Sequence, residues 1–299
     1  MMLINPFIMT DAALISSNIA ETDYAAWLVG TTYSLASRVI VIGANSHKVY
    51  ESLQAANVGN TPSTSPTWWI EVSNTNRWKM FDQSVQAQSS NATTINVSIK
   101  PTQRVDSVAL LNIAAYSVHL KMTDVTDGLV YDKTTTLASH SGINNWYMYF
   151  YEPVVRMTDF IANDLPPYSN ATIQIILTET GGTAYCGGFM VGLQQFLGNT
   201  QYGAKVGIQD YSVKTIDTFG NYTVLERAYK KTATFNLQLY TNVVDQVMAV
   251  LTPLRATPII YYGADGFDAT VIYGFYKDLA VTIAYPEIST CTLEIEGLT

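Results

Sequence analysis

Three histidines, His47, His119 and His140, are the residues best suited to acid–base chemistry near neutral pH. A nucleophile beside one of them would indicate covalent catalysis, because the imidazole can take the proton from the attacking group. The sequence places none of them in such a pattern, and it contains no GxSxG, HExxH or Walker motif. His119 falls within an alternating strand pattern and is expected to be structural. We therefore predict that the chain is not an enzyme and has no catalytic residues.

Carboxylates offer two further kinds of chemistry. A glycosidase needs two of them at a set separation, and Glu152 and Asp159 are candidates that nothing in the sequence pairs. The stretch TDVTDGLVYD places Asp124, Asp127 and Asp132 near one turn, where oxygen ligands could hold calcium. Their spacing is not that of an EF-hand, and solvated turn carboxylates are the simpler interpretation. We expect no metal site and no cofactor.

Aromatic side chains are the remaining candidates, because their rings bind sugar faces and also fill protein interfaces. The chain has 20 tyrosines, whereas 13% of its residues are charged, about half the ordinary fraction. The densest aromatic group is NNWYMYFYEP, which we interpret as a strand. A strand cannot turn all of these rings toward one core. Tyr149 and Tyr151 are therefore candidates for a subunit interface or for a glycan groove.

Bulk properties argue against several other classes of protein. The net charge of -8 is unfavourable for a nucleic-acid binder, which needs a basic face for phosphates. No apolar run approaches the roughly 20 residues of a membrane-spanning helix. Cys186 and Cys291 lie far apart without a CxxC pattern, so we expect two buried thiols. Residues 1–23 lack a basic signal-peptide segment and are expected to form an exposed arm.

Residues 24–72 form a predicted small β module whose core must be aromatic, because so short a unit buries little surface. Strand signals at 39–42 and 48–51 lie between turn-rich segments. The aromatic spacing resembles the chitin-binding type of carbohydrate-binding module found on bacterial chitinases. The matching positions are Ala26, Trp27, Tyr33, Val39, Tyr50, Gly59, Pro62, Trp69 and Val72.

The resemblance implies that Trp27, Tyr33, Tyr50 and Trp69 form the core of this module. Ala36 replaces a glycine of the family pattern, and ESLQAAN stands where the family places an exposed aromatic pair. The resemblance also implies glycan binding, for which Trp68 is the spare aromatic residue. A structural spacer or a docking module is the alternative.

Residues 73–198 alternate strand signals with turns and predict an antiparallel β-sandwich. Asp127-Gly128 and Gly181-Gly182 are expected to form hairpin turns. The opening segment NTNRWKMFDQS resembles the first strand of the galactose-binding-like jelly rolls in phage tail proteins.

This second resemblance implies that Trp78, Met80 and Phe81 enter the sandwich core. Arg77 and Asp82 would then pair with each other or cap loops.

Residues 199–299 predict an α+β unit with one helix. Gly220-Asn221 is expected in a hairpin, Thr232–Tyr240 in a strand, and Asn242 as the cap of a helix with a Val/Leu stripe. This stretch resembles the C-terminal region of tail or baseplate proteins of long-tailed bacteriophages. The fold class of the whole chain is thus predicted to be mainly β.

Together the resemblances imply a virion structural protein of the tail tip or baseplate, assembled in the host bacterial cytoplasm. Its expected partners are other tail proteins, further copies of itself in a trimer or ring, and a host surface glycan. The alternatives are a polysaccharide-targeting accessory or hydrolytic protein and a free lectin-like protein.

Overall fold

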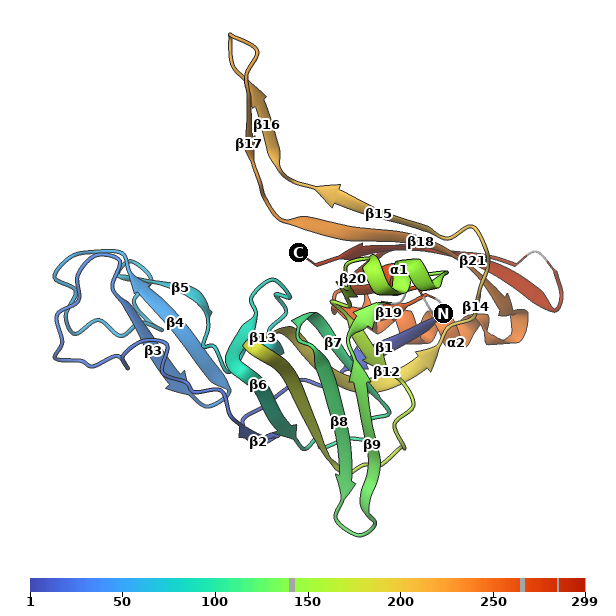
Figure 1. Cartoon of the computed structure of the whole chain (residues 1–299), viewed down its shortest axis with the longest axis horizontal. Helices are drawn as coiled ribbons and strands as arrows, with labels where there is room; N and C mark the ends of the chain where they lie inside the picture. The colour runs from blue at the N-terminus through green and yellow to red at the C-terminus, as the bar shows by residue number, and fades with distance from the viewer. Residues whose placement is uncertain (140–142, 264–266, 284, 299) are drawn as a thin grey trace. The chain divides into compact units, whose positions relative to one another are not determined.

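The computed structural model describes residues 1–139, 143–263, 267–283 and 285–298 (Figure 1). The chain divides into two compact units: a central unit, Phe7–Met190, and a terminal unit, Met1–Pro6 with Val191–Thr299. Strands dominate both units, which confirms the mainly β expectation. The predicted module 24–72 and the sandwich that follows it both belong to the central unit. His140 lies outside the described residues.

The central unit contains a three-stranded sheet, a sandwich and two short helices. The small sheet consists of β3 (Arg38–Gly43), β4 (Ser46–Ser52) and β5 (Trp69–Asn74). The other elements are β2 (Leu14–Ser17), η1 (Lys79–Phe81), β6 (Ser89–Ile99), β7 (Ser107–Ala114), β8 (Ser117–Asp124), β9 (Gly128–Thr136), β10 (Ala138–Ser139), α1 (Trp146–Tyr151), β11 (Val155–Arg156), β12 (Phe160–Ala162) and the first part of β13 (Thr172–Phe196).

The sandwich is built on strands whose apolar residues alternate with polar ones. Strand β13 pairs antiparallel with β6 on one edge and with β8 on the other. In the segments 95–99, 118–122 and 173–177 of these strands, every second residue is a buried apolar one, because successive side chains of a strand point to opposite faces. The buried set is Ile95, Val97, Ile99, Val118, Leu120, Met122, Ile173, Ile175 and Leu177. The predicted antiparallel sandwich is thereby confirmed.

The two predicted turns of the sandwich have different outcomes. The hairpin at Asp127-Gly128 is confirmed, since it joins β8 to β9. The hairpin at Gly181-Gly182 is wrong, because β13 runs straight through this pair. Gly181 has a φ of +77°, and the register with β6 shifts between Thr178 and Thr183. The glycines therefore accommodate an irregularity in a continuous strand.

The segment NTNRWKMFDQS is a turn followed by the 3-10 helix η1, so the prediction of a first strand is wrong. Thr75 accepts hydrogen bonds at its backbone oxygen from the N–H groups of Trp78 and Lys79, which winds the chain. Trp78 and Met80 are nevertheless buried, and Phe81 is partly buried. The core assignment of this segment therefore survives the change of secondary structure.

The terminal unit contains a large antiparallel sheet, a separate two-stranded sheet and an α-helix. Its strands follow the order end of β13, β1, β19, β20, β21, β18, and β18 also pairs with β14 and β15. The elements are β1 (Met2–Pro6), β14 (Asn199–Thr200), β15 (Lys205–Asp210), β16 (Val213–Ile216), β17 (Tyr222–Leu225), β18 (Tyr229–Tyr240), η2 (Thr241–Val243), α2 (Val244–Leu251), η3 (Thr252–Leu254), β19 (Ile259–Tyr262), η4 (Asp268–Thr270), β20 (Val271–Thr282) and β21 (Ile288–Gly297).

The predicted helix of this unit is α2. Its residues Val247 and Leu251 share a hydrophobic core with alternate residues of β18, such as Phe235 and Leu237. The predicted cap at Asn242 is wrong, because the turn η2 precedes the helix and Val243 takes the cap position without a side-chain bond. The strand at Thr232–Tyr240 and the hairpin around Gly220 are confirmed.

Residues 1–23 do not form an exposed arm, so that prediction is wrong. β1 lies between β13 and β19, with Leu3 and Ile4 buried. Gly192 permits this pairing, since a Cβ at that position would lie 2.2 Å from the carbonyl oxygen of Asn5. Strand β2 pairs with β6 in the central unit.

Ala36 adopts a left-handed backbone conformation with a φ of +64°. Its N–H donates to the carbonyl oxygen of Ser52 at 2.8 Å, which fixes the chain in this conformation. A Cβ in the left-handed region crowds the backbone, whereas glycine carries no such penalty. The position is also the one where the resembled family has glycine.

We predict that Ala36→Gly stabilises the small sheet by about 1 kcal/mol, because it relieves this strain. Hydrogen exchange of the β3–β5 amides should slow accordingly. Ala25→Gly is the matched control, since Ala25 is equally exposed but has no positive φ, and it should bring no gain. Faster exchange in Ala36→Gly would contradict the prediction.

Candidate functional site

Tyr33 and Trp69 form the centre of the small module. Their rings meet edge to face with centroids 5.2 Å apart. Trp69 is buried and its Nε1 donates to the carbonyl oxygen of Asn60 at 2.9 Å, while Tyr33 Oη accepts from Leu28 N at 2.7 Å. Trp69 is therefore a core residue as predicted.

The other predicted core residues of the module are less enclosed. Trp27, Tyr33 and Tyr50 are each partly buried rather than buried. So short a unit has too few residues to cover every large ring. Trp68, the predicted glycan platform, is also partly buried, and its role in glycan binding stays a prediction.

A group centred on His47, called here the His47 clasp, joins the module to the sandwich within the central unit. His47 Nδ1 lies 2.7 Å from Glu21 Oε1, and its Nε2 lies 2.8 Å from Asp11 Oδ1. Trp78 stacks on the imidazole with centroids 4.3 Å apart. Thr75 Oγ1 donates to the same Glu21 oxygen at 2.6 Å. The clasp thus ties three separate stretches of chain to one ring.

Arg77 and Asp82 do not pair with each other; each bonds to backbone groups instead, which is the second of the two predicted alternatives. Arg77 Nε donates to the carbonyl oxygen of Ile19 at 2.8 Å, and its Nη1 lies 3.5 Å from Glu21 Oε2. Asp82 accepts from the backbone N–H of Gln83. The sequence could not show this arrangement, because Glu21 precedes Arg77 by more than fifty residues.

A cavity of about 140 Å³ lies beside the clasp, between the module and η1. It is lined by Met9, Asn45, His47, Lys48, Asn74, Trp78 and Phe81. Both ring nitrogens of His47 bond to carboxylates, so neither is free to act as a base in the cavity. We assign the clasp a structural role.

The stretch Trp146–Tyr151 is the helix α1, so its prediction as a strand is wrong. Asn145 caps the helix by accepting from the N–H of Met148 at 2.9 Å. Rings four residues apart meet on the helix surface, as in Trp146 with Phe150 and Tyr147 with Tyr151. These contacts and the cap favour a helix.

The five rings of α1 are between 55% and 77% exposed. Tyr149 packs edge to face against Trp146 and Phe150, whereas Tyr151 packs against Tyr147. The two predicted glycan-binding tyrosines are therefore on an exposed aromatic helix and not on one strand face. Their binding role stays a prediction.

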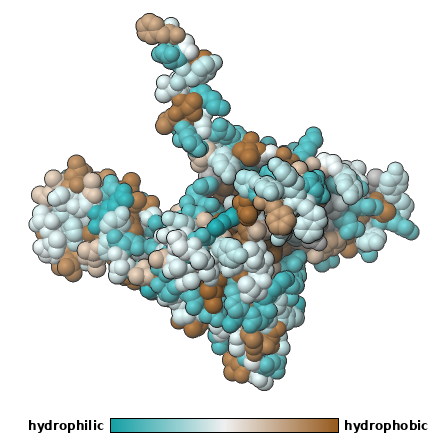
Figure 2. Space-filling model, viewed as in Figure 1, coloured by the Kyte–Doolittle hydropathy of each residue, from teal (hydrophilic) through white to brown (hydrophobic). Residues whose placement is uncertain are grey.

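A long β extension, called here the arm, projects from the sheet of the terminal unit (Figure 1). It comprises residues 201–229, and every one of them except Ser212 is exposed. Its tip is well formed: Asp217 Oδ1 accepts from the N–H groups of Phe219 and Asn221, both at 2.8 Å. Figure 2 shows apolar residues along this extension. They include Val206, Ile208, Ile216, Phe219, Tyr222, Val224 and Leu225.

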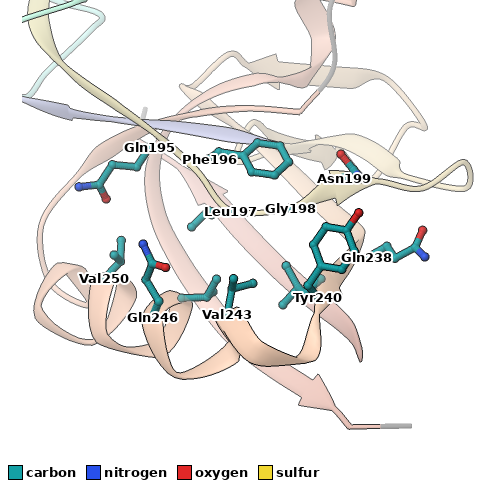
Figure 3. Close-up of a pocket in the computed structure, with 12 residues that line it drawn as sticks. Gln195, Phe196, Leu197, Gly198, Asn199, Gln238, Tyr240, Val243, Gln246 and Val250 are labelled. Carbon is teal, nitrogen blue, oxygen red and sulfur yellow. The ribbon is translucent and has the colours of Figure 1, made fainter. Parts of the chain in front are cut away.

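The terminal unit also contains a pocket of about 450 Å³ between α2 and the strands β13, β14 and β18 (Figure 3). Gln195, Asn199, Gln238 and Gln246 contribute amides, and the exposed rings of Phe196 and Tyr240 also line the pocket. The remaining lining residues are Leu197, Gly198, Leu239, Val243, Val247 and Val250. Sequence reasoning missed this pocket, because its walls come from segments about forty residues apart.

Neither cysteine is suited to nucleophilic chemistry. Both are free and buried, as predicted. Burial raises the pKa of Cys186 to about 12 and that of Cys291 to about 11. The reactive thiolate is therefore scarce at neutral pH.

Within the described residues, no three His, Cys, Asp or Glu side chains converge as metal ligands. Asp124 instead accepts from the backbone of its own turn, and Asp132 lies 2.6 Å from His119 Nε2.

No helix in the described part of the chain is long and apolar enough to cross a membrane.

Comparison with known proteins gives a weak structural similarity. No family model matches the chain, and no curated protein matches it. Among solved structures, it is similar to a mutant of chitosan-binding module 1 derived from a chitosanase/glucanase of Paenibacillus sp. IK-5. The TM-score is 0.27 and the identity 15%, over 38% of this chain and 82% of that chain. So low a TM-score carries no argument about fold or ligand.

We predict that Trp69→Ala destabilises the small sheet by about 3–5 kcal/mol, because it removes a buried ring. Trp68→Ala is the matched control and should cost clearly less, since Trp68 is partly buried. Hydrogen exchange of the β3–β5 amides measures both. Equal effects of the two substitutions would contradict the core assignment.

The clasp should make stability depend on pH. The backbone N–H of Asn45 holds the pKa of Asp11 below its ordinary value; burial opposes this and the His47 bond reinforces it. A depressed pKa stabilises the folded state above the ordinary value of about 3.9, and this contribution disappears as the pH falls through the folded value. Asp11→Asn should therefore lower the melting temperature at pH 7 more than at pH 3. If Asp11→Asn lowers the melting temperature equally at pH 7 and pH 3, the role of the carboxylate is contradicted.

Proposed function

We propose that this chain is a structural component of a bacteriophage tail tip or baseplate, which assembles with copies of itself and contributes to adsorption on host surface glycans. It acts without catalysis, and its place is the tail of the virion. The sequence resemblances of the sandwich and the C-terminal region support the tail assignment. The aromatic pattern of the small module supports the adsorption role.

The arm is the observation that carries the assembly part of this proposal. An isolated two-stranded hairpin is marginally stable in water, and this one buries almost nothing within its own chain. It carries equal numbers of cationic and anionic residues, so it meets no net repulsion from a chain of charge -8. A second copy of this chain, or another tail protein, would cover its apolar side chains.

The test is deletion of the arm's outer part. Asp210 and Tyr229 are register partners in β15 and β18, so an Asn-Gly turn can replace residues 211–228 without disturbing the sheet. We predict that the wild type forms a trimer or ring by light scattering and that the deleted variant is a monomer with an unchanged melting temperature. A monomeric wild type would overturn assembly through the arm.

A matched pair of point variants localises the effect to the tip. Phe219 is 89% exposed, and its neighbour Thr218 is exposed as well. Phe219→Glu should weaken the oligomer, whereas Thr218→Glu should leave it intact. Electron microscopy of purified virions with the labelled protein tests the tail assignment. Absence of the label from the tails would favour the free lectin or the accessory protein instead.

A further inference from the structure

The pocket of the terminal unit has the composition of a binding site for a neutral ligand. None of its twelve lining residues is a Lys, Arg, His, Asp or Glu. A charged ligand entering it would lose its hydration without gaining a charged side chain in the lining as partner. The volume of about 450 Å³ lies within the range of small-molecule sites, roughly 300–1,000 Å³.

The polar side chains of the pocket are four amides and one phenol. Gln195 Oε1 is buried and has no hydrogen-bond partner among the described residues. A buried acceptor without a partner destabilises the fold, and a ligand that donates a hydrogen bond would remove this cost once the Gln195 side chain turns its oxygen toward the pocket. In Figure 3 the amides of Gln195 and Gln246 stand on one side of the pocket, and the rings of Phe196 and Tyr240 on the other.

The apolar part of the pocket lies on the α2 side. Val243, Val247 and Val250 line it from η2 and α2, while Leu239 lines it from β18. A purely hydroxylated ligand would leave these side chains without an apolar partner. A ligand with hydroxyl groups, a neutral amide and a methyl group would match every surface.

We infer that this pocket binds an N-acetylated hexosamine residue of a glycan. The aromatic rings would stack on the C–H face of the sugar, as aromatic side chains do with amphipathic partners. The amides would pair with its hydroxyl and acetamido groups, and the acetyl methyl would contact the valines. The inference rests on the adsorption part of the proposed function, for which it supplies a site distinct from Trp68 and α1.

Three disaccharides that differ at C2 test the inference on the full chain: N,N′-diacetylchitobiose, chitobiose with free amines, and cellobiose with hydroxyls. Calorimetry and saturation-transfer NMR should show binding of the acetylated sugar. The other two sugars should bind at least about 10-fold more weakly. Equal binding of all three would overturn the acetyl assignment. No binding of the acetylated sugar would overturn the site.

Substitutions locate the binding. Gln246→Ala and Tyr240→Ala should each weaken binding of the acetylated sugar by about 10-fold. Gln103→Ala, which changes an exposed glutamine in the central unit, is the matched control and should bind as the wild type does. Unchanged affinity in both pocket variants would overturn the inference.

Tryptophan fluorescence separates this site from the central unit. All five tryptophans lie in the central unit and none of them lines the pocket, so a sugar bound there contacts no tryptophan of the lining. A change in emission that persists in Gln246→Ala would place the sugar at Trp68 or α1 and overturn the pocket.

Light scattering separates this inference from the assembly proposal. Gln246→Ala should keep the oligomeric state of the wild type. If this substitution dissociates the oligomer, the pocket is a contact site for another subunit and the sugar inference fails. If the arm deletion gives a monomer that still binds the sugar, both proposals stand independently.

Discussion

The backbone of β13 is the constraint on which both units depend, because the N–H and C=O groups of a strand this long must be paired along its length. In the central unit its residues pair with β6 and β8, and in the terminal unit they pair with β1. Each unit builds its core from the side chains that this pairing turns inward. The glycines of β13 allow for an irregularity at Gly181 and a close backbone approach at Gly192.

Local signals in the sequence correctly predicted those helices and turns that depend on interactions between residues close together in the chain. The α2 helix followed from its apolar stripe, and the turn of β8 and β9 followed from Asp127-Gly128. The α1 helix was missed because aromatic residues favour strands, although the cap at Asn145 was a readable signal. The β1 strand was missed because its partner strands β13 and β19 lie about 190 and 260 residues further along the chain.

The candidate sites were harder to predict, because they depend on tertiary packing: which surfaces stay uncovered and which distant segments meet. The sequence marked the arm as strands but could not show that neither face is covered. The resemblance to the chitin-binding type of module predicted Trp69 as a core residue, and the structure buries it. The clasp and the pocket bring together residues from distant segments, for which no spacing rule exists.

The two free cysteines are distributed one to each unit, Cys186 in the central unit and Cys291 in the terminal unit, and both are fully enclosed. An alkylating reagent reaches either sulfur after the strand around it has separated from its neighbours. The rate at which each thiol is modified therefore reports the opening of its own unit. Each unit thus contains its own natural probe of local unfolding, and no label has to be introduced.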